Sequence, residues 1–344
     1  MNIALTGGGT AGHIMPNIAL LDELRKKSNK IIYIGNSHNM EKSICESYKV
    51  KFFHTDCIKL DRTKFFANFA IPFVLPHCVK QAKKILTQQK IDIVFSKGGW
   101  VSLPTTLAAR QLGIPVVCHE SDATLGVANK LTSKYAKAVV TSHKGTFISP
   151  KTYLLGNPLR EQIFHGDEKA VLSQLNIDHT RPILLVVGGS LGALAINNTL
   201  AQSLDKLCTR YIVIHITGET FTPPTHDGYF ALPYVDNIQD FIQVADVVVS
   251  RCGANFAQEL LALSKKTLFI PLPAKASRGD QITNAQQYEQ QGYCHTLSQK
   301  DMTADSLVQA IDDTYHSNFK TYHYDRTTPA KIVTLLYRLA KNYN

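Results

Sequence analysis

The stretch that decides the fold is the first 16 residues, MNIALTGGGTAGHIMP (1–16). Residues 3–6 are uncharged and mostly apolar, as expected of a short buried strand. Glycines follow at 7, 8, 9 and 12, and an apolar period typical of a helix begins at Ile14. A glycine turn lets a ligand approach backbone N–H groups, and a helix N-terminus favours negative charge. The stretch therefore predicts a strand, a turn and a helix that hold an anion such as a diphosphate.

A dinucleotide site is disfavoured. Gly7, Gly9 and Gly12 fit the G-x-G-x-x-G pattern, but that site also needs an acidic residue at the end of the second strand to hold the ribose. The predicted second strand, 31–34, is followed by glycine and asparagine. His13 stands where the first helix begins, and we expect it to face whatever the turn holds. The alternative is a histidine that only caps local backbone.

Cysteine usage and the N-terminus indicate the compartment. The seven cysteines are an odd number and include no C-x-x-C pair, so neither a disulfide framework nor a zinc site is indicated. The residues before the first glycine lack the basic segment of a signal peptide. We therefore expect a reducing cytoplasm.

Charge is divided unevenly along the chain. Residues 1–157 hold 21 Lys and Arg against 9 Asp and Glu, a balance of +12, whereas residues 158–344 hold 16 against 18, a balance of −2. Such asymmetry indicates that the first half meets an anionic surface, either nucleic acid or the cytoplasmic leaflet of a membrane. No nucleic-acid-binding motif accompanies the charge, which favours the membrane.

Short apolar segments alternate with stretches of helical composition through both halves, a rhythm typical of parallel sheets with helices on both faces. The second half repeats the strand and glycine turn of the first at 183–187 and GGSLGA (188–193). We predict an α/β fold of two doubly wound Rossmann-like domains facing across a cleft, because such sheets bind ligands at the carboxyl ends of their strands. The predicted strands are 3–6, 31–34, 51–55, 91–95, 115–118, 137–141, 183–187, 211–216, 246–249, 267–270 and 293–296.

The predicted domain limits follow from a turn signal, GNP (156–158). We expect domains at 1–157 and 158–325. Residues 326–344 are expected to form a C-terminal helix that packs back on the first domain.

One uncharged stretch, FFANFAIPFVLPHCV (65–79), is too short and too interrupted by proline to span a bilayer. Seven basic residues surround it between 59 and 90, against the single acid Asp61. Apolar residues ringed by lysine suit interfacial binding to anionic lipid. A buried core helix with a solvated basic face explains the pattern equally well. The basic residues are Lys59, Arg62, Lys64, Lys80, Lys83, Lys84 and Lys90.

Polar motifs follow several predicted strands. SKGGWVSLP (96–104) is a second glycine turn in the first half, and HESD (119–122) places an imidazole and two carboxylates at the same predicted edge. In the second half, RCGANF (251–256) leads to Glu259, which can accept both hydroxyls of a ribose, and RGDQ (278–281) precedes Asn284. Convergence of titratable groups on one edge is typical of an active site, although structural hydrogen bonding is the alternative for each residue.

Taken in order, GGGTAGH (7–13), SKGGWVSLP, HESD with Asn129, GNPLR (156–160), GGSLGA, RCGANFAQE (251–259) and RGDQITNA (278–285) resemble the motifs of the MurG family. These enzymes are UDP-N-acetylglucosamine transferases that convert lipid I to lipid II. The resemblance covers residues 1 to about 300. It implies the GT-B fold, inversion at the anomeric carbon, no bound metal, and action at the inner face of the cytoplasmic membrane.

The resemblance also implies roles for individual residues. His13 is the first candidate for the general base, with Asp122 or Glu120 second. Thr10 and Gly12 belong to the 7–13 turn, which the resemblance places under the diphosphates of both donor and acceptor. Asp122 and Asn129 are implied to line the acceptor side. On the donor side the implied residues are Arg160, Ser190 on phosphate, Arg251, Ala254, Glu259 on ribose, Asp280 and Gln281 on sugar hydroxyls, and Asn284.

The chain departs from the family pattern at a few positions. Many members have Gln-Asn where this chain has Ser121-Asp122, glutamine at Leu191 and at Asp280, and threonine at Phe256. Asp122 adds a carboxylate to the acceptor side, which either serves as a base or repels diphosphate. Phe256 removes a hydroxyl that could contact phosphate.

The predicted activity is therefore transfer of GlcNAc from UDP-GlcNAc to the C4 hydroxyl of MurNAc in lipid I, giving lipid II for peptidoglycan synthesis. One alternative is a GT-B glycosyltransferase with another lipid or small-molecule acceptor. Another is a membrane-bound UDP-sugar-binding module without turnover. The expected partners are UDP-GlcNAc, lipid I, anionic inner-leaflet phospholipid and proteins of cell-wall synthesis and division, with no nucleic acid. No cofactor or metal is expected, and the expected location is peripheral, on the cytoplasmic face of the cell membrane.

Overall fold

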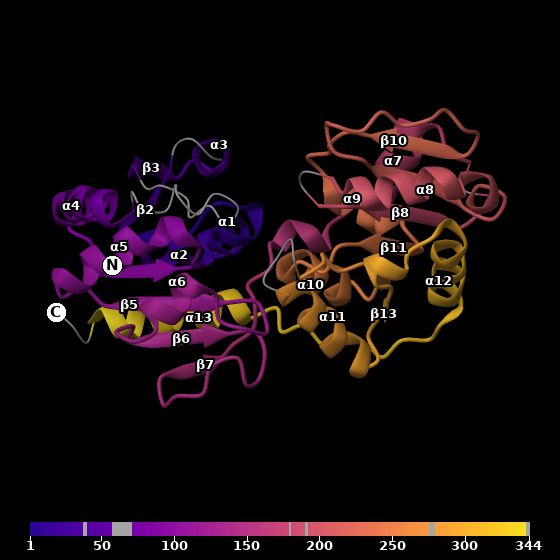
Figure 1. The fold of residues 1–344 in the computed structure, drawn as a ribbon. Helices are drawn as coiled ribbons and strands as arrows, with labels where there is room; N and C mark the ends of the chain where they lie inside the picture. The colour runs from indigo at the N-terminus through magenta and orange to yellow at the C-terminus, as the bar shows by residue number, and fades with distance from the viewer. Residues whose placement is uncertain (37–39, 57–70, 179, 190–191, 275–278, 342–344) are drawn as a thin grey trace. The chain divides into compact units, whose positions relative to one another are not determined.

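The structure is a computed structural model that describes residues 1–36, 40–56, 71–178, 180–189, 192–274 and 279–341. The chain divides into two compact units. The first unit comprises Met1–Arg160 and Asp325–Asn344, and the second unit comprises Glu161–Tyr324. Each unit contains one sheet whose paired strands are all parallel (Figure 1). The predicted fold class, two doubly wound α/β sheets, is confirmed.

The first sheet has seven strands in the order β3-β2-β1-β4-β5-β6-β7. Apolar side chains of β1 alternate between two cores: Ile3 and Leu5 belong to one, and Ala4 belongs to the other. A strand buried on both faces in this way reads as a continuous apolar run, which is why the sequence predicted it. The strands are β1 (Asn2–Thr6), β2 (Lys30–Gly35), β3 (Lys51–His54), β4 (Ile93–Ser96), β5 (Val116–Glu120), β6 (Ala138–Thr141) and β7 (Thr152–Leu154).

The second sheet has six strands in the order β10-β9-β8-β11-β12-β13, which repeats the order of the first six strands of the first sheet. Chain order reverses between β1 and β4 and again between β8 and β11. In open parallel sheets, ligands bind at such a reversal. The strands are β8 (Ile183–Val187), β9 (Ile212–Ile216), β10 (Tyr229–Leu232), β11 (Val247–Ser250), β12 (Lys266–Phe269) and β13 (His295–Thr296).

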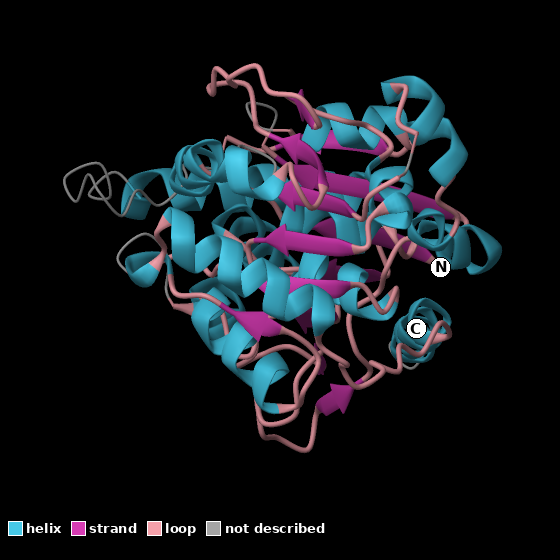
Figure 2. Ribbon diagram, turned by 90° about the vertical axis from the view of Figure 1, so that its right-hand side faces the viewer, coloured by secondary structure: helices cyan, strands magenta, loops and turns pink. Residues whose placement is uncertain are grey.

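Helices lie on both sides of the strands (Figure 2). In the first unit they are α1 (Ala11–Ile18), α2 (Leu21–Lys27), α3 (Glu41–Ser47), α4 (Ile71–Gln88), α5 (Leu103–Gln111), α6 (Val127–Thr132) and α13 (Thr328–Lys341). In the second unit they are α7 (Glu168–Leu175), α8 (Leu194–Leu207), α9 (Ile238–Val244), α10 (Ala254–Ala262), α11 (Asp280–Gln290) and α12 (Ala304–His316). Within the described part of the chain, no helix combines the length and apolar character needed to cross a bilayer.

The C-terminal helix α13 belongs to the first unit and lies beside its strands, in yellow, in Figure 1. Its buried residues Ile332, Val333 and Leu336 share a core with Ile3 and Leu5 of β1. The hydroxyl of Thr328, the first residue of α13, donates a hydrogen bond to the carbonyl of Leu155 at 2.9 Å. These contacts make the end of the chain part of the first hydrophobic core.

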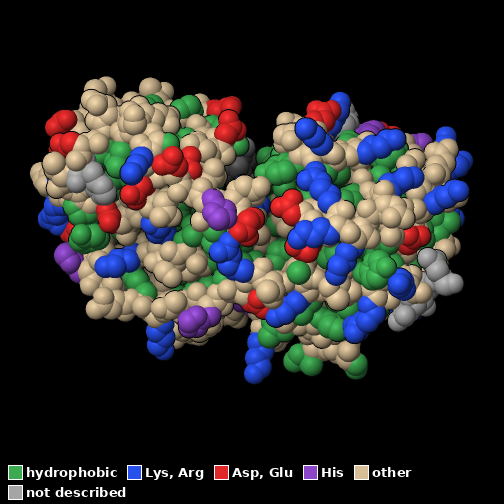
Figure 3. Space-filling model, turned by 180° about the vertical axis from the view of Figure 1, so that it is seen from behind, with side chains coloured by type: hydrophobic (Ala, Val, Ile, Leu, Met, Phe, Trp, Pro, Cys, Tyr) green, Lys and Arg blue, Asp and Glu red, His purple; other side chains and the backbone are tan. Residues whose placement is uncertain are grey.

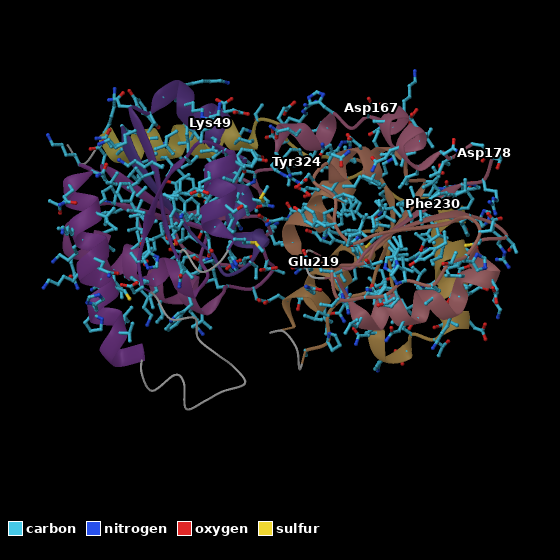
Figure 4. All side chains as sticks on the ribbon, turned by 90° about the horizontal axis from the view of Figure 1, so that it is seen from above. Lys49, Asp167, Asp178, Glu219, Phe230 and Tyr324 are labelled. Atoms are coloured by element: carbon cyan, nitrogen blue, oxygen red, sulfur yellow. The ribbon has the colours of Figure 1, made fainter. Side chains whose placement is uncertain are left out.

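The second unit is entered and left by the chain at neighbouring points. Phe164, just inside its start, stacks on Tyr324 at its end, with ring centroids 5.8 Å apart. Tyr324 is labelled in Figure 4. The second unit is one continuous stretch of sequence inserted between two parts of the first, and this ring contact joins its two ends.

Two strands were missed by the sequence prediction. β7 and β10 are the last and first strands of their sheets and are partly exposed, so they lack the buried apolar run that marks an interior strand. Part of the uncharged stretch, 65–70, and Lys59, Arg62 and Lys64 lie outside the described residues.

Candidate active site

The glycine turn after β1 is packed tightly against the turn after β4. A Cβ at Gly99, whose φ is +76°, would lie 2.5 Å from the carbonyl oxygen of Gly8, so only glycine fits there. Tyr33 Oη donates to the carbonyl of Gly7 at 2.5 Å and braces the turn from β2. The two glycine-rich motifs, 89 residues apart at their starts, therefore form one surface at the edge where β1 and β4 end.

A buried carboxylate occupies part of this turn. Glu41, at the start of α3, is fully buried, and its Oε1 accepts a hydrogen bond from Gly9 N–H at 2.8 Å. A Cβ at Gly8 would lie 2.0 Å from the same oxygen. One of the N–H groups that the sequence assigned to an anionic ligand is thus used by the protein itself. Sequence analysis missed Glu41, because nothing local shows that α3 reaches the turn.

His13 lies on the first turn of α1 and is half-buried. Its Nδ1 is 2.9 Å from Thr10 Oγ1. Thr10 is the N-cap residue of α1 but makes no capping hydrogen bond with its side chain. Its hydroxyl instead orients the imidazole. Gly12 lies between these two residues and is exposed.

Glu120 ends β5 and is 5% exposed. Its Oε1 accepts from Asp122 N–H at 3.2 Å, and its Oε2 accepts from Gly126 N–H at 2.8 Å and from Asn129 Nδ2 at 3.0 Å. Burial and the neighbouring charge of Asp122 raise the pKa of this carboxyl, while Lys97 and these hydrogen bonds act against the rise. Glu120 therefore fixes the loop that carries Asp122.

Buried nitrogen groups adjoin this carboxylate. His119 Nε2 donates to the carbonyl of Gly156 at 3.0 Å. Burial, and to a lesser extent the charge of Lys97, hold the pKa of His119 well below its usual range. Burial also lowers the pKa of Lys97 to about 8, although Glu120 and Asp122 oppose the shift. Lys97 was not singled out by sequence analysis. Its burial depends on the pairing of β4 with β1 and β5.

The second unit places its predicted residues at the carboxyl ends of β11 and β12. Arg251 follows β11 and donates to the carbonyls of Ile270 at 3.0 Å and Pro271 at 3.3 Å, and to Gln299 Oε1 at 2.6 Å. Glu259 is 5% exposed on α10. The guanidinium therefore braces the segment that follows β12.

Helix α11 carries three of the residues that the resemblance assigned to donor binding. Asp280 is its first residue, and Gln281 Oε1 accepts from Leu272 N–H at 3.0 Å. Asn284 is fully buried one turn later. Ala254, 7% exposed, begins α10. Arg160 ends the first stretch of the first unit and is half-buried.

The structure thus gathers the predicted residues into two sets, each within one unit. In the first unit, Thr10, Gly12 and His13 follow β1, and Glu120, Asp122 and Asn129 follow β5. In the second unit, Arg251, Ala254 and Glu259 follow β11, and Asp280, Gln281 and Asn284 follow β12. Ser190, Leu191 and Arg278 lie outside the described residues.

Comparison with known proteins identifies matches over both units. Residues 3–141 match the model of the glycosyltransferase family 28 N-terminal domain, and residues 183–336 match that of the C-terminal domain. The UDP-N-acetylglucosamine--N-acetylmuramyl-(pentapeptide) pyrophosphoryl-undecaprenol N-acetylglucosamine transferase of Clostridium botulinum strain Hall is 39% identical over 322 residues. The alignment covers 92% of this chain and 91% of the relative.

Two crystal structures share the fold. Acinetobacter baumannii MurG aligns with a TM-score of 0.76 and 24% identity over 98% of this chain and 99% of its own. The glycotransferase of kitacinnamycin aligns with a TM-score of 0.72 and 14% identity over 99% of this chain and 95% of its own. At these identities the structural likeness concerns the fold alone.

Proposed function

The chain belongs to glycosyltransferase family 28 and within it to the MurG family, and on that premise we infer that it transfers GlcNAc from UDP-GlcNAc to lipid I, forming lipid II. The observation that carries this function is 39% identity sustained over 92% of the chain. The resemblance noted from the ordered motifs is confirmed. UDP-GlcNAc and lipid I are accordingly its substrates.

For the chemical step we assign the general base to His13. The acceptor's C4 hydroxyl must lose a proton as it attacks the anomeric carbon and UDP leaves. A base at Nε2 requires the tautomer in which Nδ1 carries the proton, and Thr10 Oγ1, 2.9 Å from Nδ1, is placed to accept it. Attack opposite the leaving UDP inverts the anomeric centre. Thr10 is thus a positioning residue for His13.

The carboxylates after β5 receive different tasks. Glu120 uses both oxygens to accept hydrogen bonds from its own loop and from Asn129, so its task is to hold that loop. Asp122, on the same loop, is the second candidate for the base and a candidate acceptor-binding residue together with Asn129. Thr10 and Gly12 complete the proposed acceptor side in the first unit.

We place donor binding on the second unit. Glu259 is proposed to accept the ribose hydroxyls, Asp280 and Gln281 those of the sugar, and Ser190 a bond to phosphate. Ala254 and Asn284 complete the proposed set on the second unit, and Arg160, the last residue before that unit, is also proposed to bind the donor. Arg251 supports it indirectly, because its guanidinium holds the carbonyls of Ile270 and Pro271 just before α11.

Metal-free turnover is part of the proposal. Backbone N–H groups at glycine turns and helix N-termini stabilise a departing diphosphate without a cation. Activity that persists in a chelator supports this part. Its loss in EDTA and recovery on adding a divalent cation would contradict it.

We also propose that the first unit docks on the cytoplasmic face of the membrane. Lys and Arg side chains are spread over this unit, on the right in Figure 3. Between α4 and α5, a hollow of about 460 Å³ combines the apolar side chains of Leu75, Val79 and Leu107 with Lys80 and Lys83. Apolar and basic side chains together suit anionic inner-leaflet phospholipid. Cell-wall synthesis and division proteins are further proposed partners.

One assay tests the activity. Purified protein with UDP-GlcNAc and a short-chain lipid I analogue should release UDP and form a disaccharide product. UDP release only with another acceptor would indicate a GT-B transferase of different acceptor specificity. UDP-GlcNAc binding without turnover on any acceptor would indicate a binding module.

A further inference from the structure

Lys97 is a buried cation that the mechanism above does not use. It is 2% exposed, and Arg251 is the other buried lysine or arginine among the described residues. Lys97 follows β4 directly, and its N–H donates to the carbonyl of Thr6 at 2.9 Å. A Cβ at Gly7 would lie 2.9 Å from Lys97 Cβ. The side chain therefore starts against the glycine turn of the first unit.

The ammonium of Lys97 has electrostatic neighbours but no contact partner in the described part of the chain. No hydrogen bond and no ion pair within 4 Å joins it to a described residue, although the charges of Glu120 and Asp122 stabilise it. Burial outweighs both and lowers the pKa of the amine to about 8. A buried charge without a contacting counter-charge is costly, so its retention calls for a reason other than stability.

Two further buried polar atoms at this edge have no hydrogen-bond partner among the described residues: His119 Nδ1 and Asn129 Oδ1. His119 donates through Nε2 to Gly156, and Asn129 donates through Nδ2 to His119 O at 2.9 Å and to Glu120. A Cβ at Gly98, beside Lys97, would lie 2.9 Å from Asn129 Oδ1. Both atoms accept rather than donate hydrogen bonds in the neutral side chains, so among these side chains it is the ammonium of Lys97 that can attract an anion.

We propose that Lys97 supplies the buried counter-charge for the diphosphate of the acceptor. This inference rests on the proposed function. A diphosphate brought to the edge formed by β1, β4 and β5 meets the carboxylates of Glu120 and Asp122, which repel it. The ammonium of Lys97 offsets that repulsion in a water-poor setting, where a charge acts over a longer range than in solvent. This offset of the repulsion explains how the chain tolerates Asp122 where many family members have asparagine.

The elements packed around the Lys97 turn carry several titratable groups. They are His119, Glu120 and Asp122 from β5 and its loop, His13 from α1, and Glu41 from α3 on the Gly7–Gly9 turn. Burial and the charge of Lys97 hold the pKa of His119 well below its usual range, and burial raises the pKa of Glu120. Substitution of Lys97 separates its loss of charge near pH 8 from these titrations.

The experiment compares Lys97→Met, Lys97→Arg and the control Lys26→Met, whose side chain is 64% exposed in the same unit. Steady-state kinetics with UDP-GlcNAc and a soluble lipid I analogue are measured from about pH 6.5 to 9.5. Lys97→Met should raise the acceptor KM about tenfold at pH 7 and leave the donor KM unchanged. In the wild type, acceptor kcat/KM should fall above about pH 8. That alkaline limb should vanish in Lys97→Met and move to higher pH in Lys97→Arg.

Thermal unfolding supplies a second readout. Since burial lowers the pKa of Lys97, the unfolded chain binds more protons between about pH 8 and 10.5, so the charged form lowers stability below pH 8. Lys97→Met should therefore melt at a higher temperature than the wild type at pH 7. An unchanged acceptor KM, a rise confined to the donor KM, or a lower melting temperature would overturn the proposal. Absence of wild-type turnover would instead refute the proposed function.

Discussion

Lys97 in the first unit and Arg251 in the second unit occupy equivalent positions. Lys97 follows the serine that ends β4, which pairs with β1, and Arg251 follows the serine that ends β11, which pairs with β8. In chain order, β1 and β8 are the first strands of the two units. Both are buried. The guanidinium of Arg251 donates hydrogen bonds to two carbonyls and an amide oxygen. The ammonium of Lys97 makes no hydrogen bond with a described residue.

This difference shows that a repeated strand order need not repeat chemistry. The planar guanidinium offers several donors at fixed angles, so it can hold two successive carbonyls at once. A lysine offers a compact charge on a flexible stem, which suits an approaching anion. In the second unit, Arg251 holds the segment that leads into α11 by hydrogen bonds. In the first unit, we propose that Lys97 interacts with a ligand.

The largest effect is expected for the proposed general base, His13 of the first unit. His13→Ala should lower kcat by about 10² to 10⁴ while UDP still binds, as expected for loss of a general base. Steady-state kinetics and calorimetry with UDP measure the two properties. His165→Ala, an exposed histidine of the second unit, is the matched control and should leave both unchanged. Collapse of UDP binding in His13→Ala would make His13 a binding residue, and Asp122 would inherit the base function.

The next largest effect is expected for Arg251, whose guanidinium has a structural role in the second unit. Arg251→Met leaves the buried carbonyls of Ile270 and Pro271 without these donors, at a cost of roughly 1–3 kcal/mol each. The second unit should lose about 2–6 kcal/mol of stability, measurable as faster hydrogen exchange in β12 and α11. Lys97→Met should not destabilise the first unit. Equal destabilisation by both substitutions would remove the contrast between the units.

A smaller effect is expected for donor binding. Glu259→Ala should raise the KM for UDP-GlcNAc by about 10- to 100-fold, which corresponds to the roughly 1.5–3 kcal/mol that a hydrogen bond to a charged group contributes. The KM for the acceptor should stay the same, so the effect is confined to the second unit's substrate. The exposed Glu168→Ala serves as control. An unchanged donor KM would remove Glu259 from the donor site.

The smallest effect concerns the membrane. Replacing Lys80, Lys83 and Lys84 by glutamine should weaken binding to vesicles of anionic phospholipid, by about 1 kcal/mol or less per lysine, and more so at low salt. Activity should fall on a long-chain acceptor in vesicles and persist on a soluble one. The same charge change in the second unit, at Lys169, Lys206 and Lys300, should alter neither. Equal loss on both acceptors would assign these lysines to catalysis or folding.

Sequence analysis anticipated the interior strands and both glycine turns of the first unit, since apolar runs and glycines are local features. It missed β7 and β10, whose exposed edges weaken the apolar signal. It selected Glu120 as a candidate base because a carboxylate follows β5. The hydrogen bonds of its two oxygens to Asp122, Gly126 and Asn129 could not be inferred from spacing alone.

The sequence by itself determined the fold class and the family, and it predicted the strand ends at which we propose that the chemistry takes place. Periodicity and motif order report these directly, because each depends on residues close together in the chain. Only the tertiary structure decided which side chains from distant segments lie at those strand ends and which of them are buried. Glu41 reaches Gly9 across 32 residues, and Lys97 is buried through pairing of β4 with β1 and β5. Burial and partnership set the pKa and the available charge, and both depend on which distant segments the fold brings into contact.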